Sequence, residues 1–328
     1  KRSTVHYVHS NRKGDVMLKY VLKRLGYILV TLWVIVTCTF FMMKNLPGTP
    51  FDAERFSIMT PQQQERVLEM YGLNDSLPMQ YVKYIKNMLK GDLGTSFTYV
   101  NQDVSKVITG RLGPSALIGI QAVLIGLAIG LILGILAAWK HNSGIDYFTM
   151  ILAVLGVSVP NFVAAALLQY YIGLKWGALP VGFWTGWNCS VLPSIALSFS
   201  ATAMVARFMR TEMLDVLDQD YIVTARAKGL SQMKVLMRHA VRNSILPVVT
   251  ILGPIVVNLM TGSLAVENIF SIPGIGSLFV DCIKANDYPV IMGITIFYAA
   301  FYMLIVLLVD LAYSLIDPRI RLAKGKES

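Results

Sequence analysis

The amino-acid sequence predicts an all-α membrane protein that crosses the bilayer with six helices. Its 328 residues are 55% hydrophobic and only 15% charged, whereas an average soluble domain carries about 25% charged residues. The charged residues also lie between long uncharged runs, which are continuous rather than alternating and therefore favour helices over a membrane barrel. This composition excludes both a soluble globular protein and an intrinsically disordered chain.

Six uncharged runs predict the transmembrane helices, since a helix needs about 20 mostly apolar residues to cross the hydrocarbon layer. Pro160 lies inside the third run and predicts a kink, because proline removes one backbone hydrogen bond of a helix. Gly126, Gly130 and Gly134 recur every four residues in the second run, so one face of that helix is bare and permits close helix contact. The six runs are residues 25–43, 112–139, 147–174, 191–206, 244–266 and 288–309.

The basic residues predict the orientation of these helices. The segments that would share a side with the N-terminus hold 19 Lys and Arg residues, and the opposite segments hold 10. Eight of those ten lie in the loop 44–111, which is long enough to be translocated regardless of its charge. Both termini are therefore expected in the cytoplasm, and the net charge of +10 reflects topology rather than nucleic-acid binding.

The remaining segments organise the chain into distinct parts. A natural start at Met17 would make residues 1–16 a tag, a processed extension or a genuine tail, and they are left out of the fold argument. Helical patterns at 62–71 and 80–89 predict a folded outer element, and 207–243 is too charged to span the membrane. The predicted parts are the cytoplasmic tail 1–24, the first span 25–43, the extracytoplasmic element 44–111, the five-helix core 112–316 and the cytoplasmic tail 317–328.

The predicted spans offer no catalytic or metal-binding set. All four histidines lie outside the spans, and Cys38, Cys189 and Cys282 have no metal-ligand spacing. The chain also lacks a GxxxxGK[ST] nucleotide loop. Asp310, which follows the last span directly, is interpreted as an interfacial carboxylate rather than part of an ion relay. An intramembrane enzyme is therefore not supported.

Scattered neutral polar residues within the spans are candidates for a translocation path. Hydroxyl and amide groups in a membrane helix face neighbouring helices or a wet cavity, so helix packing is the alternative for each of them. The path candidates are Ser158, Asn161, Gln169, Asn258 and Ser263.

The segment 207–243 carries the most informative pattern. Asp220 lies where a helix N-terminus favours an acid, and Gly229 suits the left-handed turn that ends a short helix. A basic amphipathic helix is predicted to follow, so the segment is either a hairpin on the anionic lipid surface or a docking element for a cytoplasmic partner. Its apolar face is predicted to hold Met233, Leu236, Met237 and Ala240, and its basic face Lys234, Arg238 and Arg242.

Several motifs in one order resemble the oligopeptide, dipeptide and nickel permeases of binding-protein-dependent ABC importers. The resemblance covers almost the whole chain from Met17 and points to the B-type subunit of an oligopeptide system. The general EAA motif would place Glu-Ala-Ala at 223–225, where this chain has Val223-Thr-Ala, so the acidic role is not transferred to Val223, and Asp220 is the alternative. The motifs lie at Asp220–Leu230, Arg238–Asn243 with Pro247, Leu46–Pro50, Tyr71–Asn74, Gln80–Tyr81, Gly91–Ser96, Val266–Gly276, Asn286–Pro289 and Asp310–Arg319.

The resemblance implies a type I ABC importer permease in the bacterial cytoplasmic membrane. Two homologous permeases would form the pathway, an extracytoplasmic peptide-binding protein would deliver oligopeptides, and two cytoplasmic ATPase subunits would bind ATP and Mg²⁺. This chain would bind no cofactor and catalyse no reaction itself. Dipeptides, nickel or another small solute remain alternatives within the family, and an autonomous channel is the alternative outside it.

The resemblance also implies a coupling helix at about 218–230, which would enter a groove on an ATPase subunit. Small side chains at Ala225, Ala227 and Gly229 would let this helix seat closely. The residues assigned to ATPase coupling are Asp220, Tyr221, Ala225, Arg226, Ala227, Lys228, Gly229, Leu230, Arg238, Arg242 and Asn243.

Overall fold

The computed structural model describes residues 2–45, 56, 58–70, 72–99 and 102–316, with side chains from residue 22 onward except at 70, 258, 260–262, 310 and 312–316. Several sequence predictions lie outside the described residues or side chains. These are the motif 46–50, Tyr71, the side chains of Asn258 and Asp310, and the tail 317–328.

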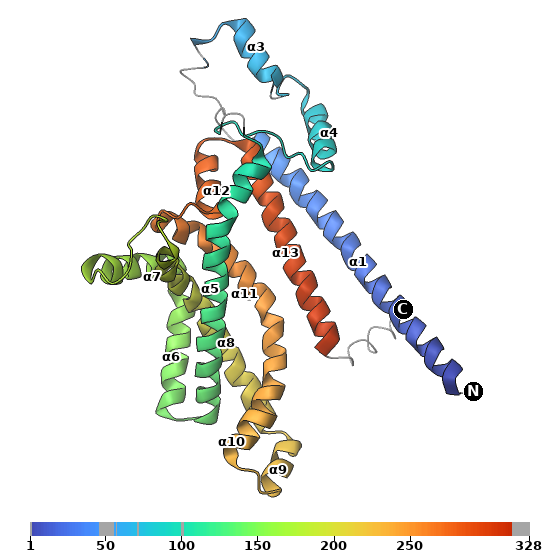
Figure 1. Cartoon of the computed structure of the whole chain (residues 1–328), viewed down its shortest axis with the longest axis vertical. Coiled ribbons are helices and arrows are strands. Elements are labelled where there is room, and N and C mark those ends of the chain that lie inside the picture. Colours follow the sequence, from blue (N-terminus) through green and yellow to red (C-terminus); the bar gives the residue numbers. More distant parts are fainter. Residues whose placement is uncertain (1, 46–55, 57, 71, 100–101, 317–328) are drawn as a thin grey trace. The chain divides into compact units, whose positions relative to one another are not determined.

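The part of the chain that the structure describes is mostly helical, with loops between the helices and one isolated bridge between Thr95 and Asp103 in place of a sheet (Figure 1). This confirms the all-α prediction. Five described helices are long and apolar enough to cross a membrane, and the number is six if one bent helix pair is counted as a single span. The five are Leu22–Lys44, Val104–Trp139, Trp187–Leu217, Gln232–Val257 and Tyr288–Val309.

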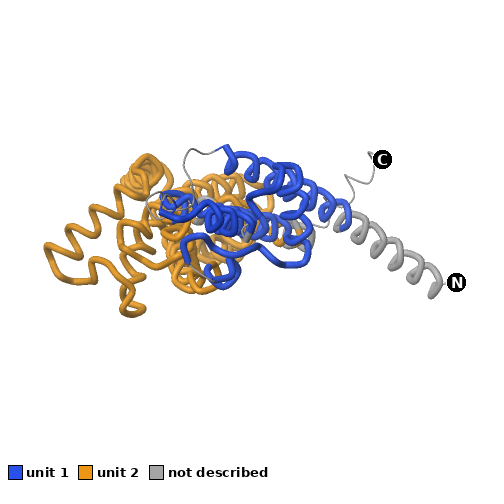
Figure 2. The backbone as a smooth tube through the Cα atoms, turned by 90° about the horizontal axis from the view of Figure 1, so that it is seen from above, with its two compact units in different colours: residues 1–107, 282–307 blue, residues 108–281, 308–328 orange. Residues whose placement is uncertain are grey.

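The chain divides into two compact units (Figure 2). Unit 1 comprises residues 1–107 and 282–307. Its core joins the buried Val36 and Phe40 to Met292, with Tyr81 packed against them. Two predicted helical patterns of the outer element are confirmed as α3 and α4. The helices of unit 1 are α1 (Arg2–Lys44), α3 (Pro61–Met70), α4 (Leu77–Met88) and the first part of α13 (Tyr288–Ile316).

A buried carboxylate organises one loop of unit 1. Asp287 is fully buried and accepts a hydrogen bond from the Ser96 hydroxyl, together with backbone bonds from Phe97 at 3.2 Å and Thr98 at 3.1 Å. Two motifs that lie almost 200 residues apart in the sequence, Gly91–Ser96 and Asn286–Pro289, therefore meet in the fold.

Unit 2 comprises residues 108–281 and 308–328 and is built around α8. Leu197 and Met209 of α8 are fully buried in its apolar core. The elements around α8 are α5 (Val104–Trp139), α6 (Gly144–Ser158), α7 (Asn161–Leu168), the π-helical turn η1 (Gln169–Lys175), the 3-10 turn η2 (Trp187–Ser190), α8 itself (Val191–Leu217), α11 (Arg242–Ile269) and α12 (Ile275–Lys284).

Glycines bring two helices into direct contact with α8. A Cβ added at Gly126 or Gly130 would lie 2.7 Å from a Cβ of α8, and one at Gly134 would lie 2.6 Å from a backbone oxygen of α8. This confirms the close contact that the four-residue glycine spacing predicts. Gly156 of α6 approaches α8 in the same way, since its Cβ would lie 2.9 Å from that of Ala203. The helix α8 therefore packs closely against α5 and α6 through glycines of both helices.

The third predicted span is broken rather than kinked. Residues 144–158 form α6, residues 161–175 form α7 and η1, and the two parts are bent by 101°. Val159 and Pro160 both have extended backbones, with ψ of 117° and 139°, as proline favours for itself and for the residue before it. Two consecutive extended residues turn the chain much further than one missing hydrogen bond would.

The fourth predicted span, 191–206, is too short. The helix α8 continues through Arg207 and Arg210 to Leu217, so eleven residues that the sequence analysis assigned to the following segment belong to the same helix. The charged residues Arg207 and Arg210 favour an end of the span at residue 206. Arg210, however, forms an ion pair with Asp146 of α6, so its charge is partnered within the packed bundle.

Replacing Gly130 by leucine is expected to lower the unfolding temperature of the purified chain in mild detergent. The new side chain would overlap Val205, and overpacking of this kind costs about 1–3 kcal/mol or more. Gly119→Leu is the control, because no atom lies within 4 Å of a Cβ added at that position of the same helix. Equal unfolding temperatures for the two variants would contradict the glycine contact.

Candidate functional site

Residues 218–243, named the hairpin from here on, extend α8 beyond its C-terminal end. They form α9 (Asp220–Ala227), a turn at Gly229, α10 (Gln232–Val235) and a π-helical turn η3 (Leu236–Val241) that leads into α11. Gly229 has a φ of +77°, which confirms the left-handed turn that the sequence predicts. In Figure 1 the hairpin lies at the lower end of α8 and α11.

The inner face of the hairpin packs against the end of α8. Ile222, Ala225 and Val235 are 5% exposed or less, and they form one cluster with Val216 and Leu217 of α8. Ala225, which was expected to seat in a partner's groove, therefore faces the hairpin's own core.

The outer face of the hairpin mixes apolar and basic side chains. Leu236 and Ala240 are buried while Met233 and Met237 are more than half exposed, so the single apolar face predicted for these four residues is wrong. The π-helical turn is the physical reason, because its wider winding aligns residues five apart and so turns Val235 inward with Ala240. The exposed side chains include Asp220, Tyr221, Val223, Arg226, Ala227, Lys228, Leu230, Lys234, Arg238, Arg242 and Asn243.

Hydrogen bonds fix the start and the end of the hairpin. The Asn243 side-chain amide donates to the Tyr221 hydroxyl at 3.1 Å, which joins the beginning of α11 to α9. The buried Ser244 hydroxyl lies 2.9 Å from the carbonyl oxygen of Ala240 and 3.2 Å from that of Glu212 in α8. The hairpin is thus attached to α8 through its core and through both of its ends.

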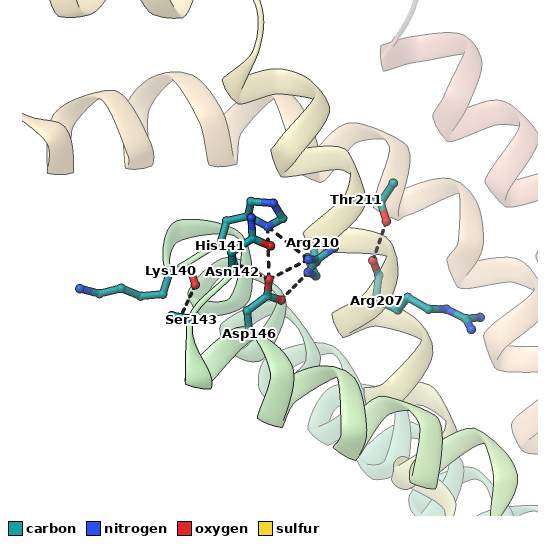
Figure 3. Close-up of polar contacts among 8 residues, drawn as sticks. All are labelled: Lys140, His141, Asn142, Ser143, Asp146, Arg207, Arg210 and Thr211. Atoms are coloured by element: carbon teal, nitrogen blue, oxygen red, sulfur yellow. Dashed lines mark hydrogen bonds and ion pairs between the residues drawn. The ribbon is translucent and has the colours of Figure 1, made fainter.

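An ion pair joins α6 to α8 close to the hairpin (Figure 3). The Arg210 guanidinium contacts both carboxylate oxygens of Asp146, with Nε at 2.5 Å and Nη2 at 2.7 Å. Asp146 also accepts the backbone N–H of Asn142 at 3.0 Å, and His141 Nδ1 lies 3.2 Å from the carboxylate. The Asp146 side chain is only 3% exposed. Sequence reasoning missed this pair, because only the fold brings together residues 64 positions apart.

A second buried carboxylate organises the opposite end of unit 2. Glu267 is fully buried and accepts hydrogen bonds from the Ser115 hydroxyl and the Gly276 N–H, both at 2.8 Å. Burial raises the pKa of the Glu267 carboxyl, while hydrogen bonds from Ser115, Ser277, Gly276 and Ser263 act in the opposite direction. A Cβ added at Gly276 would lie 2.8 Å from this carboxylate, which explains the glycine there.

The predicted path residues do not gather at one place among the described side chains. The Gln169 amide donates to the carbonyl oxygens of Val181 at 2.6 Å and Ile269 at 2.8 Å, so it acts as a packing contact. Ser263 is buried near Glu267, whereas Ser158 and Asn161 flank the break between α6 and α7. A separate, mainly apolar cavity of about 740 Å³ lies among α5, α6, α7 and α8 and contacts none of these four.

A bundle of apolar spans whose central helix continues into a charged hairpin is the architecture of a multi-pass membrane protein. The chain matches the family described as "Binding-protein-dependent transport system inner membrane component" over residues 130–322, and the N-terminal part of the same component over residues 17–114. The protein belongs to this family and is a multi-pass permease subunit of an ABC importer.

Curated relatives cover nearly the full chain. The protein is 46% identical to the dipeptide transport system permease protein DppB of Lactococcus lactis subsp. cremoris, over 93% of this chain and 100% of the relative. It is 43% identical to DppB of Bacillus subtilis, over 94% of this chain and 99% of the relative. It is 38% identical to the oligopeptide transport system permease protein OppB of Escherichia coli K12, over 93% of this chain and 100% of the relative.

A solved structure confirms the fold. The crystal structure of an amino acid ABC transporter with histidines aligns with a TM-score of 0.50 and 20% identity, and the alignment covers 66% of this chain and 94% of that one. The predicted type I ABC importer permease fold is thereby confirmed.

Replacing Glu267 by alanine is expected to destabilise the purified chain by about 2–4 kcal/mol, because the buried donors of Ser115, Gly276 and Ser277 lose their acceptor. Glu65→Ala removes a glutamate that is exposed on α3 and serves as the control. The unfolding temperature in detergent measures both effects. A loss no larger for Glu267→Ala than for Glu65→Ala would show that this carboxylate does not support the loop.

Proposed function

We propose that this permease subunit imports peptides, and that it works as part of a larger complex. A second homologous permease completes the pathway, an extracytoplasmic binding protein delivers the peptide, and two cytoplasmic ATPase subunits bind ATP and Mg²⁺. The observation that carries this proposal is the likeness to dipeptide and oligopeptide permeases along more than nine-tenths of the chain. Dipeptides join oligopeptides as substrates, because the two DppB relatives share more identity with this chain than OppB does.

The hairpin is the proposed contact with an ATPase subunit. Its inner apolar residues hold it on α8, and exposed residues such as Tyr221, Val223 and Leu230 offer apolar surface to a partner. The basic side chains of Arg226 and Lys228 border that surface. A lipid surface would also attract basic residues, but a hairpin anchored by its own core and by both ends is suited to transmit force from a protein partner.

The orientation follows from the same proposal. The hairpin and both termini lie in the cytoplasm, in agreement with the 19 basic residues counted on that side. Residues 267–277, which include Glu267 and its partners Gly276 and Ser277, and the element 44–111 then lie outside, on the side of the binding protein.

The substitution Val223→Glu is expected to reduce peptide uptake by more than tenfold without lowering the unfolding temperature, because Val223 is 61% exposed on α9. It places a charge on the docking surface but leaves the hairpin's core intact. Co-purification of the ATPase subunits and uptake of a labelled peptide measure the effect.

Two further variants make this test specific. Ala225→Glu charges the hairpin's core and should lower stability as well as uptake. Val82→Glu makes the same change as Val223→Glu at a side chain of α4 that is 58% exposed, and it should leave ATPase binding unchanged. Normal uptake by the Val223→Glu complex would contradict the docking surface.

The complete complex in proteoliposomes, supplied with its binding protein and ATP, is expected to accumulate both labelled dipeptides and longer peptides. Omission of ATP should abolish accumulation, because the proposed ATPase subunits supply the energy for import. Uptake of Ni²⁺ without peptide uptake would contradict the proposed substrate. Ion conductance by the chain alone would favour an autonomous channel.

A further inference from the structure

The Asp146–Arg210 ion pair, named the clamp from here on, joins α6 and α8 close to the hairpin. Arg210 lies seven residues before Leu217, the last residue of α8, which corresponds to about 10 Å of helix above the hairpin. Asp146 lies in the first turn of α6. The clamp therefore links the end of the helix that carries the hairpin to the beginning of the helix that leads to the 101° break.

The clamp is built for a fixed geometry. Both carboxylate oxygens of Asp146 are engaged by Arg210, at 2.5 Å and 2.7 Å, and a planar guanidinium paired with a carboxylate in this way fixes orientation as well as distance. The carboxylate also receives the Asn142 N–H at 3.0 Å, so it holds the turn between α5 and α6. The clamp thus ties this turn, α6 and α8 together (Figure 3).

A second contact fixes the other part of α6. Gly156 lies close to the end of α6 and meets Phe199 and Ala203 of α8, with an added Cβ 3.0 Å from the Phe199 carbonyl oxygen. The helix α6 is therefore attached to α8 near both of its ends, once by charge and once by close packing. The break at Val159–Pro160 follows directly after the second attachment.

We infer that Asp146 and Arg210 are positioning residues for coupling, which transmit a displacement of the hairpin from α8 to α6 and to the broken α6–α7 pair. With the clamp intact, α6 and α8 move as one body. Without it, α6 keeps its Gly156 contact but its first turn is no longer held to α8, so α6 follows the hairpin less completely and ATP is hydrolysed with less transport. The inference rests on the proposed function, because it needs a partner that moves the hairpin.

The test measures the number of peptides imported per ATP hydrolysed by the complete complex in proteoliposomes. Asp146→Asn and Arg210→Lys each weaken the clamp, and each is expected to lower this ratio by about fivefold or more while ATP hydrolysis continues. The double variant should lower the ratio of peptide imported to ATP hydrolysed no further than the more severely affected single variant does, since both changes remove the same interaction. If the two residues had a purely structural role, the variants would assemble less well or be less stable. The complexes that did assemble would still import the wild-type number of peptides per ATP hydrolysed.

Two variants serve as controls. Asp75→Asn breaks the Lys83–Asp75 ion pair of unit 1, whose N–O distance is 2.6 Å, and it should keep the wild-type ratio. His141→Ala removes a ring that touches the clamp but is 44% exposed, and it should change the ratio by less than either clamp variant.

Hydrogen exchange of the wild-type complex tests the same inference without a substitution. Backbone amides of 144–158 and of 218–243 are expected to change protection together when ATP is trapped on the ATPase subunits with vanadate. A change in the hairpin with none in 144–158, or wild-type ratios in both clamp variants, would overturn the inference and leave the proposed function intact. A wild-type complex that imports no peptide would overturn both.

Discussion

The close approach of α5 and α6 to α8 is the constraint on which unit 2 depends. Lipid tails are as apolar as leucine side chains, so helices in a membrane gain little from the hydrophobic effect and are held by close packing and hydrogen bonds instead. Gly130 and Gly134 supply that packing from α5, and Gly156 supplies it from α6. Because α8 is fixed on two faces, whatever is attached to its end is fixed as well, and the hairpin is attached there.

Buried carboxylates fix the loops and helix termini of the fold, in addition to the close helix packing that the glycines allow. Asp146, Glu267 and Asp287 are each 2% exposed or less, and each accepts several hydrogen bonds, at least one of which comes from a segment distant in sequence. An ionised group in such a place is costly unless it is fully partnered, so each carboxylate selects one arrangement of its loop or helix. Glycine packing sets how close the helices lie, and these carboxylates set which loops and termini meet.

The sequence was sufficient for features whose cause is local. Uncharged runs predict the spans, and Gly229 predicts the turn of the hairpin. It was insufficient where the cause lies far along the chain. The partial burial of Arg210 within α8 is accompanied by a pairing with Asp146, 64 positions away. The packing role of Gln169 depends on the backbone of Ile269, 100 positions away. The inward direction of Val235 together with Ala240 depends on a π-helical turn that residue spacing alone does not indicate.

The hairpin's place in the fold limits how a partner can act on the bundle. It begins at the end of α8 and runs into α11, and Ser244 bonds across to Glu212 where these helices meet. A displacement of α9 would therefore act on the ends of both helices, which the Ser244 hydrogen bond joins at that point. Of the helices next to α8, α6 is the one that then breaks sharply, at Pro160. The proposed motion of the hairpin would therefore reach the bent α6–α7 pair through α8, provided that α6 stays attached to α8.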